Sequence, residues 1–184
     1  ILDILIEDGK IKRIDKDINL KSAQVIDASG KVVSPGLIDV HTHLRDPGRE
    51  DEETIESGTR AAAKGGFTTI CCMPNTEPPV DEPAVVEFIY KRAQERGVVE
   101  VLPIATITKA RRGEALSEMG RLKRAGAIAF SDDGNWVANA HLMRRALEYA
   151  KMLNLPIISH CEDKTLSQDG VMNEGYFSTV LGLK

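Results

Sequence analysis

The residues best suited to chemistry are the triplet His41-Thr42-His43, which ends a short apolar segment. In a β-strand, residues two apart point to the same face, so both imidazoles can bind one metal ion from the end of the strand. The triplet is equally compatible with two unrelated histidines in a loop. The residues at the ends of the other strands therefore decide between a metal site and a chance pair.

Potential metal ligands also stand at the ends of two other predicted strands. Asp132 and Asp133 follow one of them, and His160 ends another. Taken singly, His160 could be a core histidine, and the aspartates could be turn residues before Gly134. Because the carboxyl ends of parallel strands meet at one mouth of a barrel, these groups together predict a divalent metal site there. Imidazoles with carboxylates suit zinc first, with other first-row ions as alternatives.

The other histidine and the cysteines have weaker claims to a metal. Cys161 follows His160 directly and a thiolate binds zinc well, but strand alternation points Cys161 away from the side of His160. His141 lies at the start of a predicted helix, and we expect it on the surface. Cys71 and Cys72 are adjacent in an apolar strand, where packing is the expected role.

From residue 36 onward, short apolar strands alternate with helical segments. This alternation predicts a parallel sheet in an α/β fold. An open doubly wound sheet or a (β/α)8 TIM-type barrel could hold the units, and potential ligands at several strand ends favour the barrel. The predicted strands cover residues 37–41, 67–73, 98–107, 127–131 and 156–160, and the predicted helices cover 53–64, 82–96, 110–125 and 139–153.

A complete barrel needs eight strands and about 250 residues. The stretch 165–184 shows no further strand pattern, so we expect a partial barrel and an incomplete fragment of a longer chain. In residues 1–35, apolar residues alternate around an Asp8-Gly9 hairpin turn, and the β pattern continues at residues 25–26 and 32–33. We therefore predict two domains, residues 1–35 and residues 36–184. The resemblance given below implies that the first is the N-terminal part of a small β-sandwich module and the second the first five β/α units of a metal-dependent hydrolase barrel.

The composition excludes several classes of function. With 28 acidic and 24 basic residues, the net charge of −4 gives no basic surface for a nucleic acid. The apolar runs are far shorter than the roughly 20 residues that a membrane span needs. Three cysteines cannot all pair within the chain, which favours a reducing, cytoplasmic location. A small molecule is the expected ligand.

Four motifs resemble those of one enzyme family. The run PGLIDVHTHLRDPG at residues 35–48 is similar to the signature that opens the barrel of the amidohydrolase superfamily, in the form that dihydroorotases carry. The runs MPNT at 73–76, FSDDG at 130–134 and SHCE at 159–162 resemble the same family at the ends of later strands. The likeness covers nearly the whole chain in the right order.

The resemblance implies a zinc enzyme, with one or two ions per subunit, that interconverts N-carbamoyl-L-aspartate and L-dihydroorotate in pyrimidine biosynthesis. His41 and His43 would bind one ion, and His160 the second. Asp133 would take the bridging position that many relatives fill with a carboxylated lysine. No lysine ends the fourth predicted strand, which agrees with the branch of the family that uses aspartate.

The same resemblance assigns the substrate-binding residues. Arg45 matches the residue that grips the substrate carboxylate, and Asn75 matches a second group that orients the substrate. From the residues alone, Arg45 could equally be a solvated arginine in a polar run, and Asn75 could be a turn former. The family also needs a further histidine ligand and a proton-transferring aspartate. We expect both beyond residue 184, so no catalytic residue is assigned within the chain.

Two other functions compete with this one. Another cyclic amidase, an allantoinase or a hydantoinase, would share the metal site, but Arg45 and the run at 73–76 favour dihydroorotase. A non-catalytic dihydroorotase-like partner subunit of aspartate carbamoyltransferase should have lost metal ligands, whereas all four are present here. The resemblance implies association with aspartate carbamoyltransferase, and the C-terminal remainder of the polypeptide is the other expected partner.

Overall fold

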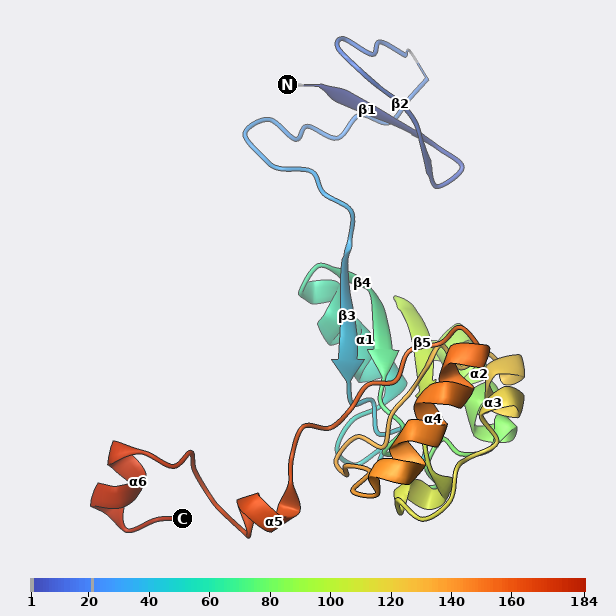
Figure 1. The fold of residues 1–184 in the computed structure, drawn as a ribbon. Helices are drawn as coiled ribbons and strands as arrows, with labels where there is room; N and C mark the ends of the chain where they lie inside the picture. Colours follow the sequence, from blue (N-terminus) through green and yellow to red (C-terminus); the bar gives the residue numbers. More distant parts are fainter. Residues whose placement is uncertain (1, 21) are drawn as a thin grey trace. The chain divides into compact units, whose positions relative to one another are not determined.

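The computed structural model describes residues 2–20 and 22–184 (Figure 1). The chain divides into two compact units, residues 1–35 and residues 36–184. No helix in the described residues is both long and apolar enough to cross a membrane.

The first unit is built on one β-hairpin. Strands β1 (Asp3–Glu7) and β2 (Lys10–Asp15) pair antiparallel. The predicted turn is confirmed, because Asp8 and Gly9 both have positive φ, at 50° and 71°, as a tight hairpin turn requires. The prediction that the β pattern continues at residues 25–26 and 32–33 is wrong, since neither stretch forms a strand.

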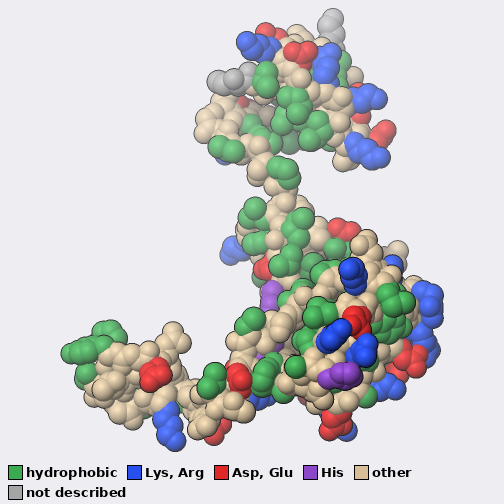
Figure 2. Space-filling view, viewed as in Figure 1, with side chains coloured by type: hydrophobic (Ala, Val, Ile, Leu, Met, Phe, Trp, Pro, Cys, Tyr) green, Lys and Arg blue, Asp and Glu red, His purple; other side chains and the backbone are tan. Residues whose placement is uncertain are grey.

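The hairpin buries little of its apolar surface within this unit. Ile6, Ile11 and Ile14 are more than half exposed, and Figure 2 shows hydrophobic side chains gathered on this part of the surface. A strand pair with no second layer has nothing to pack these side chains against. The β-sandwich interpretation therefore stays a prediction.

The second unit is a curled parallel sheet with helices on its outer side, as in part of a barrel (Figure 1). Its strands occur in the sheet in their sequence order: β3 (Leu37–Thr42), β4 (Phe67–Cys72), β5 (Glu100–Ala105) and β6 (Ala129–Phe130). The longer helices connect or follow these strands: α1 (Ile55–Lys64), α2 (Pro83–Arg96), α3 (Met119–Ala125) and α4 (Ala140–Met152). A single parallel bridge between Phe130 and Ile157 adds a fifth position to the sheet.

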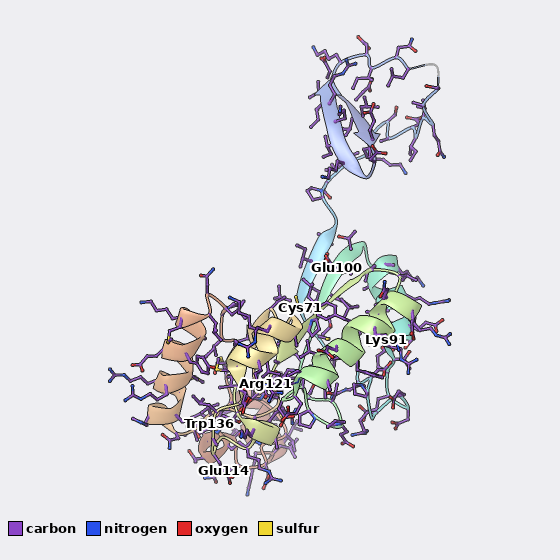
Figure 3. All side chains as sticks on the ribbon, turned by 90° about the vertical axis from the view of Figure 1, so that its right-hand side faces the viewer. Cys71, Lys91, Glu100, Glu114, Arg121 and Trp136 are labelled. Carbon is purple, nitrogen blue, oxygen red and sulfur yellow. The ribbon has the colours of Figure 1, made fainter. Side chains whose placement is uncertain are left out.

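Strand alternation divides the core of this unit into two layers. Ile70, Cys72 and Val101 face the helices, where they pack with Ile55 and Phe130. The opposite face of the sheet carries a smaller cluster formed by Cys71, Met73, Ile104 and Ala129. Figure 3 shows Cys71 on the sheet and Lys91 on the exposed side of α2. The packing role predicted for the two adjacent cysteines is confirmed, and burial raises the pKa of Cys72 to about 12.

Two predicted elements are wrong in extent. The helix predicted at 110–125 is replaced by the 3-10 turn η1 (Lys109–Arg111), a loop, and the short helix α3. Ala110 and Arg111 adopt positive φ, at 49° and 54°, because the chain doubles back to form a bridge between Thr108 and Leu116. The strand predicted at 156–160 contributes only the Ile157 bridge.

The last residues carry two short helices, α5 (Lys164–Ser167) and α6 (Tyr176–Leu181). As predicted, no strand forms in the stretch 165–184. Asp163 caps α5, because its side chain accepts a hydrogen bond from the backbone N–H of Thr165 at 2.8 Å. The chain therefore adds no further strand to the sheet after the bridge at Ile157 in the described residues.

The loops that follow β3 and β4 are packed directly on each other. The backbone N–H of Met73 donates to the carbonyl of Thr42 at 2.8 Å, and that of Glu77 donates to the carbonyl of Pro47 at 3.0 Å. Gly48 has a φ of 98°, and a Cβ placed there would lie 2.0 Å from the carbonyl oxygen of Glu77. Only glycine therefore fits at this crossing of the two loops.

This close approach predicts that Gly48→Ala destabilises the protein more than a matched change elsewhere. Gly66 is the control, because its φ is 86° and a Cβ there meets nothing within 4 Å. Gly66→Ala should cost about 1–2 kcal/mol from backbone strain alone. Gly48→Ala should cost clearly more, because it adds the clash with Glu77. Urea unfolding of the two variants measures the difference, and equal losses would contradict the close packing.

Candidate metal centre

The side chain of Asp133 lies at the centre of three imidazoles. Its Oδ1 atom is 3.3 Å from Nε2 of His41 and 3.4 Å from Nδ1 of His160. Its Oδ2 atom is 3.6 Å from Nε2 of His43. Asp133 is only 5% exposed. The structure thus brings together all four residues that the sequence assigned to the metal.

These separations suit a shared ion. Two ligand atoms that each lie about 2.1 Å from a tetrahedral ion are roughly 3.4 Å apart. The ligand atoms of His41, His43 and Asp133 all lie within 4.8 Å of one another and form a group that could hold a metal. His160 is not part of this group, but its Nδ1 atom approaches the same carboxylate oxygen as Nε2 of His41, so Asp133 faces all three imidazoles.

The backbone explains why His41 and His43 converge. His41 belongs to β3 and His43 follows its last residue, so the alternation of the strand carries both rings to one side. Their ring centroids are 5.2 Å apart. The hydroxyl of Thr42, between them, donates to the carbonyl of Cys71 at 2.9 Å. The strand end is therefore anchored to β4 through the residue that does not face the centre.

The adjacent residue Asp132 has a different role from that of Asp133. Its carboxylate accepts hydrogen bonds from the backbone N–H groups of Ile107 and Thr108, at 2.8 and 3.0 Å, and from the hydroxyl of Thr108. Burial raises the pKa of Asp132, and these hydrogen bonds partly offset that shift. Asp132 thus holds the loop after β5 against the end of β6, while Asp133 faces the histidines.

Arg111 supports the same strand end, a role that was not predicted from the sequence. Its guanidinium donates to the backbone carbonyl of Asp133 at 3.1 Å. The side-chain amide of Asn135 donates in turn to the carbonyl of Arg111 at 3.2 Å. Burial lowers the pKa of Arg111, although Asp132 and Asp133 favour its charged form. Arg111 lies in the segment predicted as helix, which hid its contact with the site.

The predicted substrate residues lie on the loops that follow β3 and β4. Arg45 comes two residues after His43, with a φ of 59°, and its Nε atom is 3.1 Å from a carboxylate oxygen of Glu52. The amide oxygen of Asn75 is 2.9 Å from Nδ1 of His43. Asn75 therefore contacts a metal-site histidine directly, a contact that the sequence did not predict.

The two residues with weaker claims lie apart from this group. His141 is exposed at the first turn of α4, as predicted. Cys161 is exposed, and its thiol donates to the carbonyl of Ser159 at 3.5 Å. In the described residues, the group of converging ligand atoms contains neither of them.

Comparison with known proteins decides the family. A family model described as "Dihydro-orotase-like" matches residues 30–184. The chain belongs to this family. A dihydroorotase of Pelotomaculum thermopropionicum is 60% identical over 182 residues, which are 99% of this chain and 42% of that protein. A dihydroorotase of Acetivibrio thermocellus is 57% identical over 184 residues, all of this chain and 43% of that protein.

Solved structures confirm the predicted α/β fold with part of a barrel. The L-hydantoinase (dihydropyrimidinase) of Arthrobacter aurescens matches with a TM-score of 0.79 and 26% identity, over 91% of this chain and 38% of that one. A D-hydantoinase matches with a TM-score of 0.70 and 27% identity, over 94% of this chain and 40% of that one. This dihydroorotase-like chain thus spans less than half the length of the relatives that it matches.

The adjacent carboxylates give a matched pair of variants. Asp133→Ala should lower the zinc affinity of the natural full-length protein by more than the roughly 10–100-fold that loss of a supporting contact costs. Asp132→Ala should instead lower the free energy of unfolding by about 1–3 kcal/mol, because it leaves two buried N–H groups unpaired. Competition with a chelating indicator and urea unfolding measure the two effects. Equal loss of zinc affinity in both variants would contradict the division of roles.

Proposed function

We propose that this chain carries the metal centre of a dihydroorotase, which interconverts N-carbamoyl-L-aspartate and L-dihydroorotate in pyrimidine biosynthesis. The observation that carries the proposal is the convergence of three imidazoles on the carboxylate of Asp133. Relatives named dihydroorotase, at 53–60% identity over the chain, support the choice of substrate. The activity belongs to a protein of the relatives' length, of which these residues span about 42%.

Zinc is the proposed ion, with one or two bound per subunit. A set of imidazoles with one carboxylate is a donor set that zinc prefers. When bound, the ion supplies a Lewis acid and lowers the pKa of bound water to about 7. His41 and His43 would hold one ion and His160 the second, and Asp133, which all three imidazoles face, would contribute to both.

Arg45 is the residue proposed to bind the substrate carboxylate. Glu52 contacts its Nε atom, which leaves the two terminal nitrogens of the guanidinium fork for a ligand. Such a fork matches a carboxylate in two parallel hydrogen bonds, which selects an acidic ring over a neutral one. Asn75, on the neighbouring loop, is the second proposed substrate contact, and we place the proton-transferring aspartate outside these 184 residues.

The proposed partners and location follow from the same assignment. Strand β3 is the edge of the sheet, and Leu37, Ile38 and Val40 are more than half exposed. The C-terminal remainder of the polypeptide is the proposed cover for this edge. We also propose a cytoplasmic protein that associates with aspartate carbamoyltransferase. Co-elution of the two purified proteins in gel filtration tests the association, and independent elution at micromolar concentration counts against it.

A substrate panel tests the function. The natural full-length protein should hydrolyse dihydroorotate, lose this activity when a chelator removes its metal, and regain it with zinc. Hydantoin and allantoin should be poor substrates, because neither supplies the ring carboxylate for Arg45. Fast turnover of hydantoin but not of dihydroorotate would assign the protein to the hydantoinases, which its fold also resembles. A protein that binds no zinc would instead favour a non-catalytic subunit.

Arg45 variants test the substrate grip. Arg45→Ala should raise KM for N-carbamoyl-L-aspartate roughly 10–100-fold, because charge-assisted hydrogen bonds contribute about 1.5–3 kcal/mol. Arg45→Lys should recover only part of the loss, since lysine keeps the charge but not the planar fork. Arg144→Ala, on the exposed face of α4, is the control and should leave KM unchanged. An unchanged KM in Arg45→Ala would remove Arg45 from the site.

A further inference from the structure

Two of the imidazoles that face Asp133 also contact a side-chain oxygen through their other ring nitrogen. Nδ1 of His43 lies 2.9 Å from the amide oxygen of Asn75, while its Nε2 faces Asp133. Nε2 of His160 lies 3.0 Å from a carboxylate oxygen of Glu162, while its Nδ1 faces Asp133. The two rings therefore present opposite nitrogens to the centre, and each has an acceptor on its other side.

The position of the acceptor decides which nitrogen can bind a metal. A neutral imidazole has one N–H and one lone pair, and an oxygen acceptor draws the proton to the nitrogen that it contacts. For His43 this leaves the lone pair on Nε2, and for His160 it leaves the lone pair on Nδ1. Asp133 is also an acceptor, but it lies farther from each ring, at 3.6 Å from His43 and 3.4 Å from His160, so the inner nitrogen is the one left for a metal ion.

Both acceptors are themselves fixed by further contacts. Asn75 lies between two residues that are hydrogen-bonded. The N–H of Met73 donates to the carbonyl of Thr42 at 2.8 Å, and the hydroxyl of Thr76 donates to the carbonyl of Pro78 at 2.7 Å. These bonds hold the loop that carries Asn75 beside the end of β3.

Glu162 is held by the turn that follows it. The hydroxyl of Ser167 donates to its second carboxylate oxygen at 2.8 Å, and Ser167 ends helix α5. The first oxygen is thereby left for His160. Unlike the neutral amide of Asn75, this acceptor carries a charge, which makes the imidazole that donates to it a more basic ligand.

We propose that Asn75 and Glu162 are positioning residues of the metal centre, which fix His43 to coordinate through Nε2 and His160 through Nδ1. The proposal rests on the metal centre of the proposed function and does not depend on which cyclic amide is the substrate. It adds to Asn75 a role that precedes substrate binding, and it gives Glu162 a role that neither the motif nor the fold assigned.

Zinc affinity of the metal-stripped natural protein provides the first test. Asn75→Ala and Glu162→Ala should each weaken zinc binding about 10–100-fold in competition with a chelating indicator. Asn75→Asp and Glu162→Gln keep an acceptor oxygen in place and should recover most of the affinity. Unchanged affinity in both alanine variants would overturn the proposal.

Two matched controls separate positioning from general loss of structure. Asn139 caps α4 by accepting from the N–H groups of His141 and Leu142, and Glu148 pairs with arginines on the same helix. Asn139→Ala and Glu148→Ala change the same residue types away from the centre and should leave zinc affinity unchanged. Equal losses in the controls and in the Asn75 and Glu162 variants would reduce the effect to stability and overturn the proposal.

Nitrogen NMR of the histidine rings provides the second test, independent of activity. In metal-free protein at alkaline pH, where imidazoles are neutral, His43 should carry its proton on Nδ1 and His160 on Nε2. Asn75→Ala should mix the tautomers of His43 alone, and Glu162→Ala those of His160 alone. The opposite tautomers in the unaltered protein would overturn the proposal, whereas turnover of hydantoin in place of dihydroorotate would overturn only the substrate assignment.

Discussion

The buried carboxylate of Asp133 is the constraint on which the rest of the site depends. At 5% exposure it has lost most of its hydration, so its charge must be balanced from within the protein. A metal ion between the three imidazoles and the carboxylate would balance this charge. Because His43 and His160 meet acceptors on their outer nitrogens, the inner nitrogens are those best left free for a metal. The buried carboxylate thus determines how the imidazoles and a metal ion can be arranged around it.

The sequence predicted the members of this centre because strand geometry alone brings them together. His41 and His43 are two residues apart, so one face of one strand presents both rings. Asp133 and His160 follow later strands of the same parallel sheet, whose carboxyl ends share one edge. The α/β class and the order of elements followed from the alternation of apolar strands with helices. These are properties of spacing, which a sequence displays directly.

What the sequence could not predict depends on contacts between distant residues. The segment after β5 contains alanine, arginine and glutamate, which favour a helix, yet Ala110 and Arg111 take left-handed conformations. The buried carboxylate of Asp132 draws the N–H groups of Ile107 and Thr108 to itself, and this tertiary contact outweighs local preference. The support that Arg111 gives to Asp133 arises from this turn, so it was hidden for the same reason.

The open edge at β3 has a consequence for how such a protein is made. Strand β3 is synthesised before the rest of its own sheet, so its open side is exposed for an interval while this unit is being made. Throughout that interval, Leu37, Ile38 and Val40 lie beside unpaired backbone groups on a parallel strand. Such an edge is a template for pairing with a neighbouring nascent chain. Self-association through this strand during synthesis is therefore the hazard that the strand order of the sheet creates.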